Sequence, residues 1–443
     1  MARAGEAGVK IKLGVLGVED SLQVVQDIVA EYPDFECYPC LWRKIDDVVP
    51  LLQQYDGRVD MWLSAGRIPY LTALAWGGLA HPIFHLPYKG ASLYRTLCKV
   101  FYTQTIKMNE ISFDSVLAED LKQVFDELGI SEAPAYVRPF QTGMSEEDNV
   151  QYHYDLWKNG KTKLAITCAW NVKKGLEALG VPYYRVLPAR SAVEATLNMM
   201  LRLHEMQGVR DAQIAVQILE FDALSDASQE WRSADDLYSE EMKIKQRLLA
   251  YAKRVQGSLK AAGPSRFIVF TTRGMLREIT AEFSRMPVDA AYMPLEQGMA
   301  ACGIGIGLSA YEAEFYAAKA LLQAKAQGTG AWMVLFDDKT VVGPLGRQEQ
   351  LTYSCNAAHL QAASERTSIS VSTLSKIEGV MQREQHEDIS ASELAQRLQI
   401  MPRSARRIVQ QLEKAGLAIV SSEETLSRRG RPRKRYKILL GQK

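Results

Sequence analysis

Arginine side chains near the end of this 443-residue sequence are spaced as they would be on a helix that reads DNA. Residues 402–412 follow a helical repeat in which Ile408 and Leu412 face inward and polar side chains face outward. Guanidinium groups on such a face suit guanine edges and phosphate oxygens in a major groove. The side chains predicted to meet the bases are Arg403, Ser404, Arg406, Arg407 and Gln410.

A second group of cations lies in a polar segment between two predicted strands, Leu417–Val420 and Lys434–Leu440. The cations expected to contact phosphates or the minor groove are Arg429, Arg431, Arg433 and Lys434. Residues 401–443 contain 12 Lys or Arg against 3 Asp or Glu, a local charge of +9, so the remainder of a chain with net charge +1 carries −8. This asymmetry is typical of a nucleic-acid-binding module. A solvated basic tail behind a protein-interaction domain is the alternative.

Two helices and a turn are needed to present these side chains, and the sequence predicts them. Residues 389–398 carry an apolar helical stripe, and residues 399–401 form a short turn. Pro402 suits a helix start because its missing N–H needs no partner there, and Gly416 suits a left-handed helix end. This pattern, with its RGRPRKRYK segment, resembles winged-helix transcription regulators and their GRPR-type wings. The resemblance implies a winged helix-turn-helix over residues 386–443 that binds double-stranded DNA.

The middle of the chain has a different pattern. Residues 211–346 alternate strands and helices in the order β-α-β-α-β-α-β, which fits a ferredoxin-like or nucleotide-cyclase-like sheet. The segment GIGIGLSAYEAEFYAAKAL, a glycine-rich strand at 302–308 followed by a helix, resembles the GGDEF and GTP-cyclohydrolase-III-like group. The resemblance implies that Glu220 and Asp222 lie where that group holds a metal. Its other acid should lie in a hairpin at Thr271–Gly274, where TTRG has none.

The missing acid leads us to expect a degenerate domain with no enzymatic activity, no metal and no cofactor. The expected role of this domain is to sense a nucleotide or another ligand, or to act as a dimerising spacer. The alternative function is that of a nucleotide-processing or nucleotide-binding enzyme with a DNA tether, in which Glu220 and Asp222 bind Mg²⁺.

Residues 10–205 repeat a strand–loop–helix pattern that predicts parallel sheets covered by helices. Loops at the carboxyl edge of such sheets bind ligands, and helix N-termini there attract anions. Two lobes separated near residues 111–160 would enclose a cleft, and Ser21 is expected to cap the helix Leu22–Tyr32. The residues expected to bind an effector are Glu19, Asp20, Ser21, Ser64, Gly66, Ser92 and Thr167.

Four segments of this region, GVLGVEDS, VDMWLSAGRIPY, LPYKGASLY and LAITCAWNV, resemble the sensor domains of propionate-type bacterial regulators. Those domains follow a two-lobed plan like that of periplasmic binding proteins. The resemblance therefore implies a small effector in the cleft. The alternative is an α/β domain that is purely structural.

Cysteine and histidine pairs could carry redox or metal chemistry, but their surroundings argue against it. Cys37 and Cys40 form a C-x-x-C pair inside a predicted strand, with no second pair, so buried apolar side chains are favoured over a redox or metal site. His81 and His85 are separated by a proline and cannot share a helix face, so no metal site is expected there.

Taken together, these patterns predict a multidomain α/β and α+β protein: a two-lobed sensor at 10–205, a degenerate cyclase-like domain at 211–346, a helical connector at 351–385 and a C-terminal winged helix. The connector either forms a second helix-turn-helix or packs against the DNA reader. Six scattered cysteines, no signal segment and no apolar run of about 20 residues indicate a cytoplasmic protein away from membranes. We expect a ligand-responsive transcription regulator that forms homodimers and binds DNA and a small-molecule or nucleotide effector.

Overall fold

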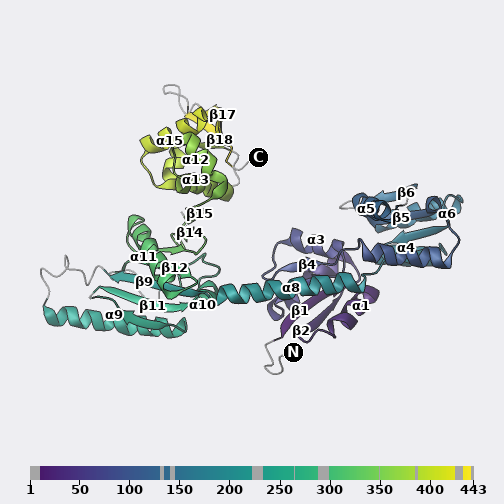
Figure 1. Cartoon of the computed structure of the whole chain (residues 1–443), viewed down its shortest axis with the longest axis horizontal. Helices are drawn as coiled ribbons and strands as arrows, with labels where there is room; N and C mark the ends of the chain where they lie inside the picture. Colours follow the sequence, from purple (N-terminus) through teal and green to yellow (C-terminus); the bar gives the residue numbers. More distant parts are fainter. Residues whose placement is uncertain are drawn as a thin grey trace. The chain divides into compact units, whose positions relative to one another are not determined.

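The chain divides into two compact units between Glu205 and Met206 (Figure 1). The computed structural model describes residues 10–129, 134–139, 145–221, 233–263, 265–287, 299–348, 350–384, 388–424 and 433–440. Among these residues, no helix is long and apolar enough to cross a membrane. Short 3-10 helices lie at Ile45–Asp47, Asp56–Arg58, Met108–Glu110 and Ala358–Leu360.

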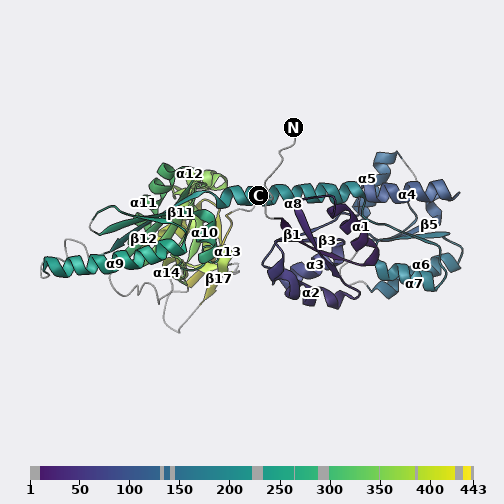
Figure 2. The ribbon, with the colours of Figure 1, turned by 90° about the horizontal axis from the view of Figure 1, so that it is seen from below.

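The first lobe of unit one is a parallel sheet in the order β2-β1-β3-β4, covered by helices on both faces (Figure 2). Its strands are β1 (Ile11–Gly17), β2 (Phe35–Leu41), β3 (Met61–Ser64) and β4 (Ile83–His85). Its helices are α1 (Glu19–Val29), α2 (Val48–Tyr55), α3 (Arg67–Trp76) and α8 (Arg190–Asp211). Helix α1 begins before Ser21, whose hydroxyl donates to the Val18 carbonyl at 3.3 Å, so the predicted cap at Ser21 is wrong.

The second lobe repeats this design with a parallel sheet in the order β6-β5-β7-β8. Its strands are β5 (Ile111–Val116), β6 (Tyr136–Pro139), β7 (Leu164–Thr167) and β8 (Tyr183–Arg185). Its helices are α4 (Ala91–Thr103), α5 (Ala118–Leu128), α6 (Glu146–Lys158) and α7 (Trp170–Ala178). Residues 111–160 therefore build half of this lobe, and the predicted separation of the lobes there is wrong.

The chain crosses between the two lobes at helices α4 and α8, and the apolar face of each helix packs in the core of one lobe. Leu97 of α4 packs in the core of the second lobe, whereas Val193 and Leu197 of α8 pack in the core of the first. The chain thus enters the second lobe at α4 and returns to the first at α8. Both lobes of unit one are therefore α/β domains, each with a parallel sheet. The protein as a whole is a mixed α/β chain of several domains.

Unit two contains a seven-stranded mixed sheet in the order β10-β11-β9-β12-β13-β14-β15. The strands are β9 (Ile214–Phe221), β10 (Ser258–Ala261), β11 (Arg266–Thr272), β12 (Met299–Gly307), β13 (Ala331–Leu335), β14 (Thr340–Gly343) and β15 (Leu351–Ser354). Helices α9 (Ala234–Arg254) and α10 (Arg273–Ile279) cover one face, and α11 (Ala310–Ala326) covers the other.

Two predictions for this sheet are wrong. Residues 258–261 form strand β10, which the predicted order of elements lacks, because Leu259 pairs with Val269 of β11. The hairpin consequently turns between Ala261 and Arg266, and Thr271–Gly274 instead ends β11 and begins α10. The observed element order therefore includes an extra strand after the first helix.

Among its described residues, the C-terminal part of unit two contains four helices and a short strand, followed by a β-hairpin. The elements are α12 (Gln361–Thr367), α13 (Val371–Glu384), β16 (Ile389–Ser390), α14 (Ala391–Leu398), α15 (Pro402–Lys414), β17 (Ala418–Glu424) and β18 (Arg433–Ile438). The strands form an antiparallel sheet in the order β16-β18-β17. Leu360 and Ile377 share one core with Leu394 and Leu412, so the connector packs against the C-terminal helices.

Glycines in β12 allow α11 to lie directly on the sheet. A Cβ on Gly303 would overlap the Ala317 carbonyl oxygen, and a Cβ on Gly305 would overlap the Ala313 carbonyl oxygen and the Ala317 nitrogen. Because these obstacles are backbone atoms, they cannot rotate away. Glycine in a strand commonly marks such a close approach.

We predict that Gly305→Ala destabilises unit two by about 1–3 kcal/mol, at the upper end of the range because the added methyl meets backbone. Gly208→Ala is the matched control, since a Cβ on this helical glycine meets nothing within 4 Å and alanine favours a helix by up to about 1 kcal/mol. Thermal unfolding followed by circular dichroism compares the two variants. Equal melting temperatures would show that the close approach is not a constraint.

Candidate functional site

Helix α15 presents the side chains that the sequence assigned to DNA. Ala405, Ile408, Val409 and Leu412 are buried on its inner face. Arg403, Arg406, Arg407 and Gln410 are exposed on the other side, and Ser404 is half-buried. The helix starts at Pro402 and ends beside Gly416, whose φ of +72° allows the Leu417 amide to donate to the Leu412 carbonyl at 2.8 Å.

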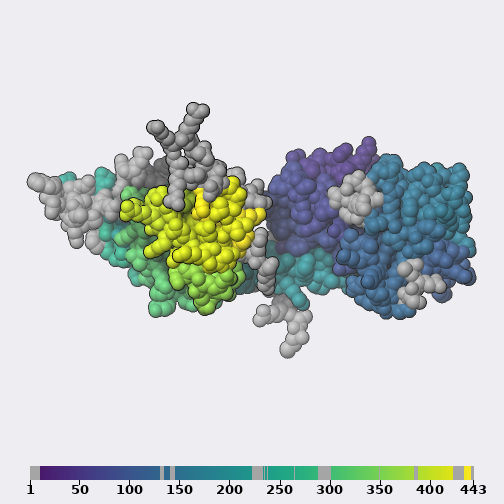
Figure 3. Space-filling model, turned by 90° about the horizontal axis from the view of Figure 1, so that it is seen from above, coloured from purple at the N-terminus to yellow at the C-terminus, as the bar shows by residue number. Residues whose placement is uncertain are grey.

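An open groove runs along α15, and three elements line it. The groove holds about 1300 Å³ of space, part of it open to solvent. Its lining residues come from α15, from the start of α14 and from β18: Pro402, Arg406, Val409, Gln410, Glu413, Ser390, Ala391, Ser392, Lys434 and Tyr436. Figure 3 shows the surface of this C-terminal part in yellow.

Only some of the predicted DNA-contacting residues line this groove. Arg406, Gln410 and Lys434 do, whereas Arg403, Ser404 and Arg407 lie outside its lining. Arg429 and Arg431 are outside the described residues, and of Arg433 only the backbone, at the start of β18, is described.

A capping box and an arginine fix the start of α14 against β18. The Ser390 amide donates to Glu393 at 2.8 Å, and the Glu393 amide donates to the Ser390 hydroxyl at 3.2 Å. Arg435 of β18 binds the carboxylates of Asp388 at 2.9 Å and Glu393 at 3.1 Å. Partial burial alone would raise the pKa of Glu393, but the hydrogen bonds from Ser390 and Arg435 hold this pKa below its usual value. Arg435 therefore positions the groove.

A second candidate site is the cleft between the lobes of unit one. It holds about 550 Å³ of space, part of it open to solvent. Its lining residues are Gly17, Val18, Ser21, Trp42, Ala65, Gly66, Arg67, Ile68, Pro69, Tyr88, Ser115, Glu146, Cys168, Ala169, Trp170 and Arg185. Val18, Gly66 and Ala169 are the N-cap residues of α1, α3 and α7, and none of these helix starts has a side-chain cap. Three positive helix ends therefore meet at this cleft.

Charged and aromatic side chains complete the cleft. Arg185 is held by Asp20 at 2.7 Å and donates to the Cys168 carbonyl. Burial raises the pKa of Tyr88, whose hydroxyl donates to the Ala65 carbonyl, so the phenol stays neutral. The indole nitrogen of Trp42 is buried without a hydrogen-bond partner among the described residues, which leaves a donor beside the cleft.

The structure brings only part of the predicted effector set to this cleft. Ser21 and Gly66 line it, and Asp20 reaches it through Arg185. The buried Ser64 hydroxyl donates to the Gly66 carbonyl at 2.7 Å, just behind the lining.

The other predicted residues do not line the cleft. Ser92 and Thr167 are buried and accept the amides of Ala189 and Ala169, each at 3.0 Å. Glu19 is exposed at the start of α1. Sequence reasoning missed the cleft residues Trp42, Arg67, Tyr88, Ser115, Glu146, Trp170 and Arg185. One available signal was that Arg185 ends strand β8, at the same carboxyl edge as the predicted loops.

The carboxylate of Glu220 in the middle sheet is already occupied by cations. Arg266 binds it at 2.9 Å, and Lys325 binds its other oxygen. Burial opposes ionisation, but these hydrogen bonds lower the pKa of Glu220 overall. Asp222, its predicted partner, lies outside the described residues. Within the described part of the chain, no group of three His, Cys, Asp or Glu side chains could hold a metal ion.

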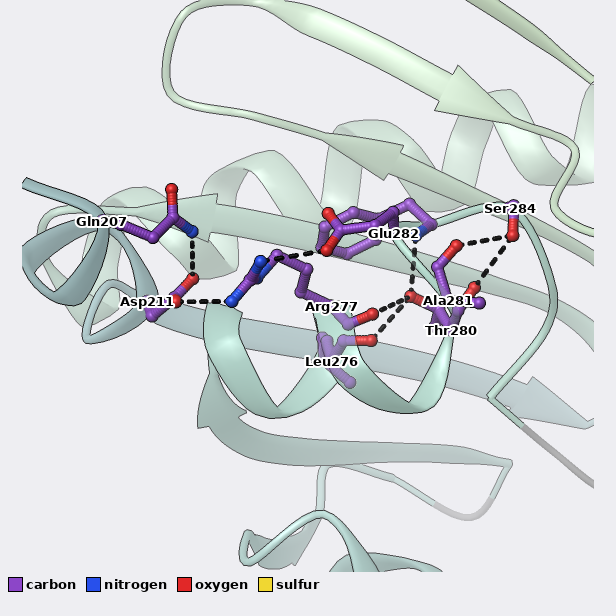
Figure 4. Close-up of polar contacts among 9 residues, drawn as sticks. Gln207, Asp211, Leu276, Arg277, Thr280, Ala281, Glu282 and Ser284 are labelled. Atoms are coloured by element: carbon purple, nitrogen blue, oxygen red, sulfur yellow. Dashed lines mark hydrogen bonds and ion pairs between the residues drawn. The ribbon is translucent and has the colours of Figure 1, made fainter. Parts of the chain in front are cut away.

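A polar cluster ties the end of α8 to α10 within unit two (Figure 4). Arg277 binds Asp211 at 2.7 Å and Glu282 at 2.9 Å, and Gln207 donates to Asp211 at 3.0 Å. Glu282 belongs to a left-handed turn at residues 281–283, in which three consecutive non-glycine residues have positive φ. Such backbone is strained and persists only where its surroundings hold it.

From this turn, hydrogen bonds continue toward the C-terminal helices. The Phe283 carbonyl accepts from the Gln350 side chain at 2.7 Å, and the Gln350 carbonyl accepts from Arg383 of α13 at 2.8 Å. Helix α13 itself lies against β15, since a Cβ on Gly379 would meet the Thr352 carbonyl at 2.7 Å. Polar contacts thus link the end of α8 to helix α13 of the C-terminal core.

Comparisons with known proteins give no family assignment. No protein-family model matches the chain, and no curated protein matches it. An NtrC-family transcriptional regulator from Clostridium acetobutylicum is 12% identical over 45% of this chain and all of that one, with a TM-score of 0.35. The transcription regulator CcpA of Lactococcus lactis is 12% identical over 45% of this chain and 92% of its own, with a TM-score of 0.29.

A LacI-family transcriptional regulator from Enterococcus faecium, with bound ribose, is 14% identical over 44% of this chain and 91% of its own. Its TM-score is 0.25. These structural neighbours are transcription regulators, but all three TM-scores lie below 0.5. The function of the chain must therefore be argued from its own residues.

The thiols of the C-x-x-C pair are held in their protonated form. Burial raises the pKa of Cys37 to about 11 and that of Cys40 to about 12. We predict that at pH 8 about one Cys37 thiol in a thousand is ionised, so iodoacetamide labels the exposed Cys98 at least about 100-fold faster than Cys37 or Cys40. Peptide mass spectrometry of the native protein measures the rates. Rapid labelling of Cys37, or a disulfide formed under mild oxidation, would restore the redox interpretation.

Proposed function

We propose that this chain is a ligand-responsive transcription regulator with a C-terminal winged helix. The observation that carries the proposal is the element order α13-β16-α14-α15-β17-β18 around one core, with sheet order β16-β18-β17. A winged helix has this order of helices and strands, and its last helix is the one that enters the major groove. The exposed cations of α15 lie on the helix that would do so.

The groove supports a specific docking geometry. Arg406 and Gln410 would reach base edges, because an arginine fork suits guanine and a side-chain amide suits adenine. The start of α14, with the hydroxyls of Ser390 and Ser392, would meet a phosphate, since helix N-termini attract anions. Lys434 would neutralise a second phosphate from the other wall. The phosphates fix the register and the bases supply the sequence preference.

The cleft of unit one is the proposed effector site. Its lining combines apolar and aromatic side chains with a few polar groups, as the lining of a ligand pocket does. Three helix starts without side-chain caps and the side chain of Arg67 favour an anionic group. Arg185 contributes less charge because Asp20 neutralises it. We therefore propose a small organic anion whose apolar part lies beside Trp42 and Trp170.

The middle sheet is proposed to transmit and dimerise rather than to catalyse. Its order β10-β11-β9-β12-β13 fits a degenerate cyclase-like domain, in which the hairpin between β10 and β11 would carry the acid. The residues at that hairpin, 262–265, read AGPS and contain none. The ion pairs of Glu220 further argue against a metal there, so the nucleotide-processing alternative is not favoured.

Allosteric control requires two states with different effector affinities. In unit two, the contacts of Asp211 with Arg277 and of Gln350 with Arg383 connect α8 to α13. A shift of α8 would first displace the left-handed turn 281–283, because the strained backbone of this turn depends on its contacts with Arg277 and Gln350. This turn is the proposed bistable element.

We predict that duplexes selected from a random pool by the full-length protein share a defined site. Arg406→Ala should cost about 1–3 kcal/mol of binding free energy and relax the preference at one base pair. Lys434→Ala is the matched variant, since it also removes one positive charge from the groove but from the wall proposed to meet a phosphate. It should weaken binding to all DNA sequences alike and reduce the salt slope by about 1. Fluorescence anisotropy over a salt series measures both; selection without any enriched motif would contradict the proposal.

We predict that small carboxylates or phosphates stabilise the full-length protein in a thermal-shift screen. A ligand at 100 times its Kd should stabilise unit one by about 2.7 kcal/mol. Arg67→Ala should weaken this effect, because it removes a cation that lines the cleft. Arg43→Ala, which removes an exposed arginine outside the cleft lining, should leave it unchanged. A screen in which only neutral or cationic compounds raise the melting temperature would refute an anionic effector.

A further inference from the structure

Helix α11 carries several large apolar side chains on the side away from its own sheet. Its inner face consists mostly of alanines: Ala313, Ala317, Ala320 and Ala324 are buried against the sheet, together with Tyr316 and Leu321. The glycines of β12 let the helix backbone approach so closely that alanines fill most of this inner face. A surface helix that packs only on its own domain carries mainly polar residues on its outer face.

The outer face of α11 forms an apolar stripe. Leu308, just before the helix, is 73% exposed, Tyr311 is 81% exposed, Phe315 is 47% exposed and Leu322 is 68% exposed. Their spacing places them on one side of the helix, because residues three, four and seven apart are neighbours on a helical surface. Contiguous apolar surface of this kind marks an interaction site, whereas single exposed apolar residues do not.

The stripe is complementary to a second copy of itself. In an antiparallel pair of α11 helices, one register places Tyr311 opposite Leu322 of the partner copy, and also Phe315 opposite Ala318 and Glu314 opposite Lys319. The first contact is apolar, the second fits a large residue to a small one, and the third joins opposite charges. Each contact occurs twice, as a two-fold axis requires. A parallel pair would instead place Glu314 against Glu314.

We propose that the outer face of α11 is a homodimer interface whose occupant is a second copy of this chain, packed with its α11 antiparallel. This inference names the surface through which the proposed homodimer forms. It rests on the proposed function only in assuming that the protein is a homodimer. Close packing of α11 on β12 holds the stripe in place, so the interface is preformed. Two DNA readers would then be related by the same two-fold axis as a palindromic site.

Sedimentation velocity of the full-length chain over a concentration series tests the interface. Phe315→Glu should raise the dimer dissociation constant by about 30-fold or more, the effect of removing a central interface residue. Leu249→Glu on α9 is the matched control: Leu249 is 49% exposed, close to the 47% of Phe315, but lies on another helix. It should leave the dimer intact. Circular dichroism establishes that both variants are folded.

Charge exchange gives a second test that does not depend on Phe315. Glu314→Lys and Lys319→Glu should each weaken the dimer, whereas the double variant should restore it, because each substitution places like charges in contact and the pair exchanges them. Failure of the rescue overturns the antiparallel register. The α11 interface is overturned if Phe315→Glu leaves the dimer intact, or if Leu249→Glu dissociates it. DNA selection tests the proposed regulator function independently of this interface. A wild-type chain that stays monomeric overturns both the interface and the proposed homodimer.

Discussion

The direct packing of helix α11 on strand β12 is the constraint on which unit two depends. Strand β12 lies between β9 and β13 in the sheet, so its position fixes strands on both sides. Gly303 and Gly305 bring a helix backbone against it, and no larger residue fits without displacing that backbone. The same approach has a second consequence. Because alanines fill most of the inner face of α11, Tyr311 and Phe315 remain available on the outer face.

The sheet also determines where the C-terminal helices stand. Its edge strand β15 meets α13, where Gly379 permits contact with the Thr352 carbonyl. Helix α13 then shares one core with α14 and α15, so a rigid displacement of the edge strand would move the whole C-terminal core. The bond from Arg383 to the Gln350 carbonyl fixes the same junction from the polar side. A connector built this way transmits position, which a flexible linker could not do.

Local patterns in the sequence predicted the C-terminal helices well because the helical repeat, Pro402 and Gly416 all depend on neighbouring residues. The cleft was predicted less well, since its lining combines residues such as Trp42 and Arg185 whose proximity depends on two lobes closing together. The missed strand β10 has the same cause: Leu259 continues an apolar helical stripe, and only its pairing with β11 shows that it is a strand. The predicted effector residues Ser92 and Thr167 do not line the cleft, because their hydroxyls accept the amides of Ala189 and Ala169 inside the fold.

The arginines of this chain separate into two groups that differ in their partners. Arg277 donates to carboxylates and Arg383 donates to a carbonyl within the fold, and these contacts position helices. Arg403, Arg406 and Arg407 have no hydrogen-bond or ion-pair partner among the described residues and are exposed on one helix. Cations gathered without internal anions repel one another and favour an external polyanion. The difference lies in their surroundings rather than in residue type, and it is why α15, rather than the arginine-bearing junctions, is the surface proposed to bind DNA.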